Sequence, residues 1–212
     1  IITTPELLPR IPVDDLPNLE KVVVVGDGSD DKYIDFDKSF EQASDEFEIE
    51  WLDKEDGLIL HYTSGSTGQP KGVLHVQYAM VQHYISGKYV LDLKEDDVYW
   101  CTADPGWVTG TSYGIFAPWL NGATNVVVGG RFSPESWYGA IQDLNVNIWY
   151  SAPTAFRMLM GAGDEIVNDY DLSSLRHVLS VGEPLNPEVV KWGMKVFNLR
   201  IHDTWWMTET GA

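Results

Sequence analysis

The sequence has one cysteine, few basic residues and no long apolar run, and each shortage excludes a class of protein. Cys101 alone cannot form an internal disulfide, so a disulfide framework is excluded. No apolar run reaches the roughly 18 residues of a membrane span, and no secretory leader is visible, so we expect a cytoplasmic protein that binds no membrane. Lys and Arg number 14 against 32 Asp and Glu, and the net charge of −18 disfavours nucleic acid, which is bound by basic surface.

Aromatic residues, in contrast, are abundant. The chain has 9 Trp, 10 Tyr and 7 Phe, and 44% of its 212 residues are hydrophobic, which is enough for an ordinary core. We therefore expect a globular chain of one domain or two closely packed lobes. The acidity is concentrated in residues 27–56, with thirteen acidic and three basic residues, and this segment is interpreted as a solvated surface loop. Residues 60–75 contain no acidic residue, so an anionic ligand could be received there.

Short apolar runs alternate with helical patterns along the chain. Ser133 is a predicted N-cap followed by Pro134, and Asn186 is a predicted cap followed by Pro187. Apolar residues at Met80, Val81, Tyr84 and Ile85 have the spacing of an amphipathic helix. The alternation predicts an α/β fold with mostly parallel sheets and flanking helices. The predicted strands are 22–25, 57–62, 98–101, 125–128, 148–150, 177–181 and 200–204, and the main helices cover 77–91, 133–145, 153–162 and a segment from Pro187.

A segment rich in glycine and hydroxyl groups, YTSGSTGQPKG, follows the second predicted strand. Gly65, Gly68 and Gly72 let the backbone turn tightly and approach a ligand. Successive N–H groups and four hydroxyls could hold phosphate oxygens, and Lys71 would add a positive charge. These hydroxyls belong to Thr63, Ser64, Ser66 and Thr67. A polar hairpin between two strands is the alternative, although glycine and proline alone would suffice for one.

The spacing in this segment excludes the phosphate loop of P-loop NTPases. That loop places four residues between its glycines and a hydroxyl residue after its lysine. Here Gly68 follows Gly65 after two intervening residues, and Lys71 is followed by Gly72. A kinase of that class is therefore not expected.

Two further segments stand out downstream. SVGEPLNPE covers 180–188, and a strand, a turn and a helix explain it equally well without any ligand. DTWWMTETG covers 203–211 and places two adjacent Trp at the end of a predicted strand. The carboxylate of Glu209 is a hard oxygen ligand of the kind that suits magnesium.

In order and spacing, these three segments resemble the motifs of the adenylate-forming superfamily, which includes acyl-CoA synthetases, luciferases and peptide-synthetase adenylation domains. The resemblance implies that the 182–184 turn lies against the adenine of ATP. It also implies that Thr208 contacts the α-phosphate, that Glu209 helps to hold Mg²⁺, and that Lys71 joins them in catalysis. The implied ATP- and AMP-binding residues are Thr63, Ser64, Gly65, Ser66, Thr67, Gly68, Lys71, Gly182, Glu183, Pro184, Asp203, Thr204, Trp205, Trp206, Met207 and Thr208.

Within the superfamily, GWVTG at 106–110, APT at 152–154 and the double Trp are similar to acetyl-CoA synthetases. The resemblance implies an acyl pocket of Val108, Thr109, Val181 and Trp206, with Thr109 and Ala152 toward coenzyme A. The stretch 129–133 departs from the Pro-Asn that some of these enzymes have, so no coenzyme A contact is carried over there. The implied reaction converts acetate and ATP to acetyl-AMP and pyrophosphate, then passes the acetyl group to coenzyme A.

Two alternatives remain open. A propionyl-CoA or other short-chain acyl-CoA synthetase would share these motifs, and the chain alone could be a nucleotide-binding module without turnover. The resemblance implies that 1–56 is the end of a preceding α/β subdomain plus an acidic linker, and that 57–212 is a truncated AMP-binding α/β subdomain. The ribose-binding Asp and the C-terminal domain with its adenylation Lys would lie beyond residue 212. We therefore expect an excised part of a larger parent, inactive without the C-terminal domain.

Overall fold

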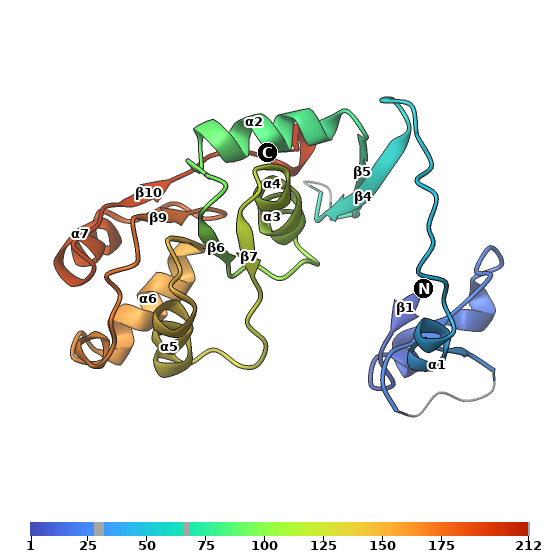
Figure 1. Ribbon diagram of the computed structural model, residues 1–212, viewed down its shortest axis with the longest axis horizontal. Coiled ribbons are helices and arrows are strands. Elements are labelled where there is room, and N and C mark those ends of the chain that lie inside the picture. The colour runs from blue at the N-terminus through green and yellow to red at the C-terminus, as the bar shows by residue number, and fades with distance from the viewer. Residues whose placement is uncertain (28–31, 66–67, 212) are drawn as a thin grey trace. The chain divides into compact units, whose positions relative to one another are not determined.

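The computed structural model describes residues 1–27, 32–65 and 68–211 (Figure 1). The chain divides into two compact units, Ile1–Trp51 and Leu52–Ala212. The first unit contains a small parallel sheet of β1 (Ile2–Thr3), β2 (Val23–Val24) and β3 (Ile34–Asp35), in that order. It also has the 3-10 helices η1 (Leu8–Arg10) and η2 (Val13–Asp15) and the helix α1 (Phe36–Glu41). All residues from 36 to 56 are exposed, as expected for the acidic segment.

The second unit is built on a five-stranded sheet in the order β10-β9-β8-β6-β7. Every neighbouring pair in it is parallel, which confirms the predicted α/β class. Its strands lie at five of the predicted positions, with ends that differ by two residues at most. They are β6 (Val98–Cys101), β7 (Thr124–Val126), β8 (Ile148–Ser151), β9 (His177–Ser180) and β10 (Ile201–Asp203).

Alternate side chains along these strands enter two separate cores, because successive residues of a strand point to opposite faces. On one face, Trp100 and Trp149 pack with residues of α5 (Pro134–Leu144), α6 (Pro153–Ala162) and α7 (Pro187–Val196). On the other face, Tyr99 and Tyr150 pack with residues of the π-helical turn η3 (Ser112–Phe116) and of α4 (Ala117–Leu120). Helix α3 (Val108–Thr111) leads into η3, and the 3-10 helix η4 (Ile166–Asp169) lies between α6 and β9.

The helix starts follow the predicted caps, with one difference. The Ser133 hydroxyl accepts a hydrogen bond from the Ser136 N–H at 3.1 Å, and Ser136 Oγ accepts one from the Ser133 N–H at 3.3 Å, forming a capping box. Asn186 occupies the N-cap position of α7, but its side chain makes no capping hydrogen bond. The predicted cap position and the helix start at Pro187 are confirmed, but the Asn186 side chain does not bond to the first turn.

An antiparallel hairpin departs from the predicted parallel pattern. It consists of β4 (Gly57–Thr63) and β5 (Lys71–Val76), and Thr63 pairs with Lys71 at its closed end. Strand β5 was not predicted, because the glycine-rich segment before it and the helix pattern after it left only a few residues between them. The glycine-rich segment is thus the loop of a hairpin, as in the alternative interpretation given in the sequence analysis. A hairpin loop can also bind phosphate, so the phosphate-binding role stays a prediction.

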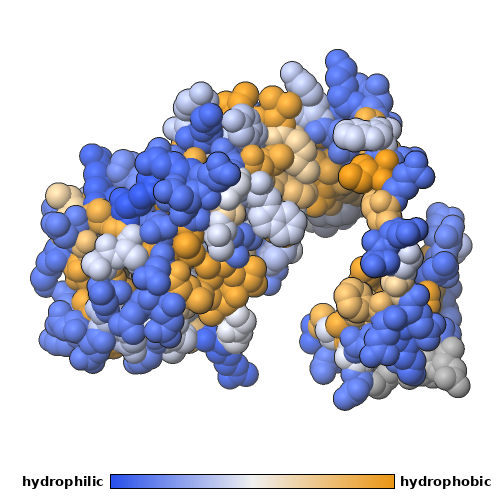
Figure 2. Space-filling view, in the orientation of Figure 1, coloured by the Kyte–Doolittle hydropathy of each residue, from blue (hydrophilic) through white to orange (hydrophobic). Residues whose placement is uncertain are grey.

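Helix α2 (Ala79–Tyr89) confirms the predicted helix but turns its apolar stripe outward. Val81, Tyr84 and Ile85 are 43%, 39% and 44% exposed, whereas the buried residues are His83, Ser86 and Gly87. A Cβ on Gly87 would lie 3.1 Å from Ala117 Cβ, so small residues let α2 approach α4 closely. Hydrophobic residues consequently gather on the surface over α2 (Figure 2). Within the described ranges, no helix combines the length and apolar character of a membrane span.

Candidate functional site

The neighbouring strands β6 and β8 form a topological switch point in the five-stranded sheet. The chain leaves β6 toward β7 on one side and leaves β8 toward β9 on the other. Loops that diverge in this way leave a crevice outside the carboxyl ends of the strands, where ligands of open α/β sheets bind. A cavity of about 560 Å³ lies there.

The cavity brings together predicted residues from three segments that are distant in the sequence and that each follow a strand. Thr109 follows β6, Ala152 follows β8, and Val181, Gly182 and Glu183 follow β9. Val108 and Trp206 do not line it in the described part of the chain. Sequence reasoning missed several residues of the wall, although most of them adjoin a motif. They are Cys101, Asp104, Trp107, Phe132, Trp137, Tyr150, Thr154 and Met158, among others.

The Glu183 carboxylate is held at the cavity wall by two residues near the start of α6. The Thr154 hydroxyl lies 2.7 Å from both carboxylate oxygens, and the Arg157 guanidinium lies 2.5 Å from Glu183 Oε2. The hydrogen bonds from Thr154 and Arg157 lower the pKa of Glu183, so this group is ionised at neutral pH. Gly182, the residue before Glu183, has φ +92°, a backbone conformation that favours glycine. The contacts with Thr154 and Arg157 fix the orientation of the Glu183 carboxylate.

The thiol of Cys101 lies on the same wall at the end of β6. Burial raises the pKa of Cys101 to about 11. The group is therefore a neutral thiol at physiological pH and lacks the thiolate character that a nucleophile needs.

The segment after β10 reaches the cavity through Tyr150. The Trp206 indole Nε1 lies 3.4 Å from the Tyr150 hydroxyl, and its ring meets Tyr113 edge-on with centroids 5.3 Å apart. Trp206 packs against the buried core that contains Tyr150, whereas Trp205 is 83% exposed. The indole of Trp206 thus lies next to a wall residue of the cavity. The remaining residues of this predicted stretch, Asp203 and Met207, are exposed.

The hairpin loop carries the predicted phosphate-binding residues. Gly65 and Gly68 have φ +61° and +80°, and a Cβ on Gly65 would lie 2.3 Å from the Gln69 carbonyl oxygen, so this turn requires glycine. Ser66 and Thr67 lie outside the described residues. Lys71 is exposed at the start of β5, and its side chain makes no hydrogen bond or ion pair with any described residue.

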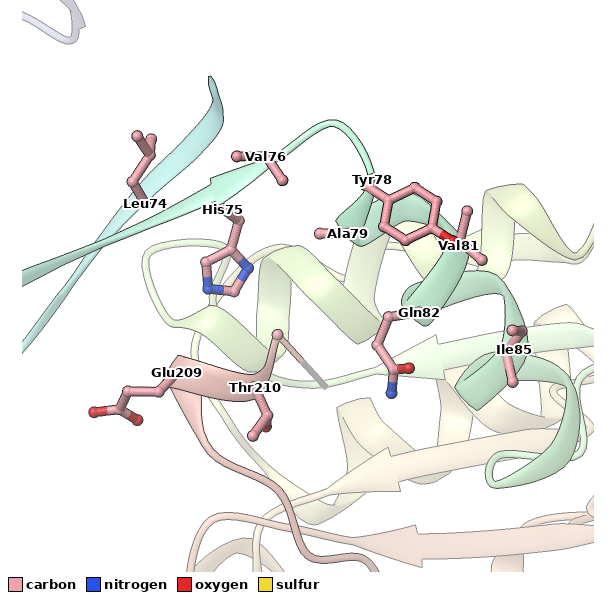
Figure 3. Close-up of a pocket in the computed structure, with 11 residues that line it drawn as sticks. Leu74, His75, Val76, Tyr78, Ala79, Val81, Gln82, Ile85, Glu209 and Thr210 are labelled. Atoms are coloured by element: carbon pink, nitrogen blue, oxygen red, sulfur yellow. The ribbon is translucent and has the colours of Figure 1, made fainter. Parts of the chain in front are cut away.

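One contact joins the hairpin to the Thr-Glu motif. The His75 Nε2–H donates to the Thr208 carbonyl oxygen at 2.8 Å, which links β5 to the 3-10 helix η5 (Thr208–Thr210). Figure 3 shows the His75 ring directed from β5 toward η5, beside a groove of about 450 Å³ that α2 also lines. The structure therefore gathers Thr109, Ala152 and the 181–183 turn at the sheet-edge cavity, and it places Thr208 and Glu209 at this junction with the hairpin. The Glu209 carboxylate is exposed at the junction and forms no ion pair with the described residues.

The family model described as AMP-binding enzyme matches residues 2–212. The chain belongs to this family. The AMP-binding chain is 72% identical over 214 residues to the acetyl-coenzyme A synthetase of Bacillus subtilis strain 168, covering 100% of the chain and 37% of that protein. It is 48% identical over 179 residues to the Deinococcus radiodurans acetyl-coenzyme A synthetase, covering 81% of the chain and 28% of that protein.

Solved structures of acyl-CoA-forming proteins share the fold of the AMP-binding chain. A Brucella canis acyl-CoA synthetase has a TM-score of 0.89 at 32% identity, over 98% of the chain and 38% of that protein. An anthranilate CoA ligase in complex with anthranoyl-AMP has a TM-score of 0.91 at 29% identity, over 100% of the chain and 41% of that protein. The predicted family is confirmed. The chain spans 37% of the length of its Bacillus relative.

Proposed function

We propose that the protein containing this chain activates acetate with ATP, forming acetyl-AMP and pyrophosphate, and then transfers the acetyl group to coenzyme A. The observation that carries the proposal is the cavity at the switch point of the sheet. It gathers residues assigned to the acyl group, to coenzyme A and to the adenine within one space of about 560 Å³. The 72% identity to a protein named acetyl-coenzyme A synthetase supports acetate as the acid.

In this proposal the cavity wall and the hairpin share the nucleotide. The turn from Gly182 to Pro184 lies against the adenine, while the N–H groups of the hairpin loop and the ammonium of Lys71 receive phosphate oxygens. Lys71 is available for this role because its charge is not neutralised by any described residue. Thr208 lies toward the α-phosphate. Thr109 and Ala152, both on the cavity wall, face the acyl group and coenzyme A.

Glu209 fits a magnesium ion bound together with ATP. Its carboxylate is exposed and a hard oxygen donor, which suits Mg²⁺. No group of three or more His, Cys, Asp or Glu within the described ranges could hold a metal, so the remaining ligands would be phosphate oxygens and water. When bound, the ion supplies neutralisation of phosphate charge.

The residues of this chain act by positioning and by charge. An oxygen of the acetate carboxylate attacks the α-phosphorus, and the bond from this phosphorus to the pyrophosphate oxygen breaks. Lys71 stabilises the charge that develops on the departing pyrophosphate. In the second step the sulfur of coenzyme A attacks the acetyl carbonyl carbon, AMP leaves, and the thiol proton passes to solvent. Cys101 remains protonated with its pKa of about 11, which fits a route without a cysteine acyl intermediate.

The domain layout and location belong to the same proposal. Residues 1–56 would end a preceding subdomain and 57–212 would form part of the AMP-binding subdomain, completed by a C-terminal domain of the same parent. Acetate, ATP and coenzyme A would be its small-molecule partners, and the cytoplasm its compartment.

Acid-dependent exchange of labelled pyrophosphate into ATP by the full-length protein tests the proposal. We expect exchange with acetate, none without an acid, and kcat/KM for acetate above that for propionate. A higher kcat/KM for propionate would favour the short-chain alternative. Nucleotide binding without exchange for any short acid would contradict the enzyme assignment. The 212-residue chain, measured in parallel, should form no acyl-CoA.

A further inference from the structure

Four residues at the carboxyl ends of β8, β9 and β10 form a continuous chain of hydrogen bonds. Thr204 Oγ1 lies 2.9 Å from the Ser180 carbonyl oxygen and 2.7 Å from the Tyr150 hydroxyl. The Tyr150 hydroxyl lies 3.4 Å from Trp206 Nε1. The bonds join residues that are 24, 54 and 56 positions apart in the sequence.

The protons of this chain can be placed in only one way. A carbonyl oxygen only accepts, so Thr204 donates its single hydroxyl proton to Ser180. Tyr150 must therefore donate to Thr204. The indole N–H only donates, so Trp206 donates to the Tyr150 oxygen, whose lone pairs are free for it. Every member then has a partner, and the direction runs from Trp206 to Ser180.

The surroundings keep this arrangement constant. Tyr150 is 0% exposed, and burial raises its pKa far above the usual range, so its hydroxyl stays protonated at any physiological pH. Tyr113 packs edge-on against both rings, with centroids 5.7 Å from Tyr150 and 5.3 Å from Trp206. The aromatic contacts fix the plane of the indole, and the hydrogen bond fixes which edge faces Tyr150.

We propose that Tyr150 and Thr204 are positioning residues that hold the Trp206 indole in place and so limit the length of the acyl chain. The proposal rests on the proposed function and on the assignment of Trp206 to the acyl pocket that the family resemblance implies. The indole lies against Tyr150, which lines the cavity. The Trp206 indole can exclude acids longer than acetate only while its ring is held in one orientation. Tyr150 lines the cavity itself, so it carries the link from Thr204 to the space that the acid would enter.

The kinetic test compares kcat/KM for acetate with that for butyrate in full-length variants. Tyr150→Phe keeps the ring and removes both hydrogen bonds of the hydroxyl, and Thr204→Val removes the acceptor for Tyr150. Each should lower the acetate-to-butyrate ratio at least about tenfold, toward the ratio of Trp206→Gly, since methylene discrimination spans roughly 10–200-fold. Thr204→Ser keeps the hydroxyl and should therefore keep the wild-type acetate-to-butyrate ratio.

Tyr113→Phe is the matched control, because it is the same substitution in the same cluster and its hydroxyl lies outside the hydrogen-bond chain. Its ratio should stay within about twofold of wild type. KM for ATP, measured in each variant, separates any loss of nucleotide binding at Thr204 from the change in acid preference. Thermal unfolding identifies a variant that is merely unstable.

A second measurement does not depend on turnover. In full-length protein labelled with 5-fluorotryptophan, the Trp206 fluorine resonance is identified by its loss in Trp206→Phe. It should shift or broaden in Tyr150→Phe and in Thr204→Val, and remain in place in Thr204→Ser. An unchanged resonance, or a wild-type ratio in both variants, would overturn the proposal. Failure of the wild-type protein to use any short acid would instead overturn the proposed function, whatever the resonance shows.

Discussion

The carboxyl edge of the five-stranded sheet and the β4–β5 hairpin differ in whether their predicted site residues have side-chain partners within the chain. At the sheet edge, Glu183 is held by Thr154 and Arg157, and Trp206 is held by Tyr150. At the hairpin, Lys71 has no partner among the described residues. On the neighbouring helix α2, both ring nitrogens of the buried His83 also lack one. The Glu183 and Trp206 side chains are therefore held by the chain itself, whereas the charge of Lys71 is available to a ligand.

Packing separates the two regions in the same way. The central strands β8 and β9 are buried on both faces, but Leu60, Tyr62 and Leu74 on the hairpin are 51%, 69% and 61% exposed. A two-stranded hairpin is at best marginally stable alone. The sheet edge thus holds its side chains in fixed positions, whereas Lys71 lies on a hairpin with less packing around it.

The largest expected effect comes from removing the charge of the hairpin. In the full-length protein, Lys71→Ala should slow acid-dependent exchange roughly 10²–10³-fold, the scale for losing one group that stabilises developing charge. Coenzyme A binding should change much less. Lys195→Ala on α7, which breaks a largely exposed pair with Asp164, is the control and should change exchange less than about twofold. Equal exchange rates in wild type and Lys71→Ala would contradict the assignment of Lys71 to phosphate binding.

The next effect concerns stability and pH at His83. Burial, and then the charges of His75 and His61, lower the pKa of His83 from 6.5 to about 4. As pH falls through 6.5, the unfolded chain takes up a proton that the folded chain refuses until about pH 4. Stability contributed by this residue is therefore present above pH 6.5 and lost toward pH 4, by about 3 kcal/mol in total.

His83→Phe keeps a ring against Phe116 and removes this titration. Denaturant unfolding at pH 7, 6, 5 and 4 should show a flatter loss of stability than in wild type. Val81→Ala, on the exposed face of the same helix, removes no titrating group; it is the control and should keep the wild-type slope. A slope unchanged by His83→Phe would show that the ring is not buried in its neutral form.

The smallest effect is expected at the preorganised edge. Arg157→Ala removes one partner of Glu183 but leaves Thr154, and both charged side chains are about 40% exposed, so solvent screens the pair. KM for ATP should rise severalfold, with little change in KM for acetate. A double-mutant cycle with Thr154→Val measures the coupling of the two partners. Larger effects here than at Lys71 would reverse the comparison between the two regions.

The sequence predicted elements whose signals are local. Ser133 and Pro134 mark the start of α5, and the run from Val98 to Cys101 marks β6, because caps and apolar runs act over a few residues. The apolar spacing in α2 predicted the helix but not its orientation, because the close approach of Gly87 to Ala117 on α4 depends on tertiary packing. The bonds among Tyr150, Thr204 and Ser180 could not be predicted, since they depend on which strands become neighbours.

The hydrogen bond from His75 to Thr208 connects two proposed binding sites, the hairpin with Lys71 and the carboxylate of Glu209. Lys71 lies four residues before His75 on β5, and Glu209 follows Thr208 directly. In the proposed function, a phosphate ligand on Lys71 that shifts β5 changes the affinity of Glu209 for Mg²⁺ by some factor. Thermodynamic reciprocity requires the cation to change the affinity for that ligand by the same factor. Titrations of each ligand at fixed concentrations of the other would measure this factor twice, and only one value is allowed.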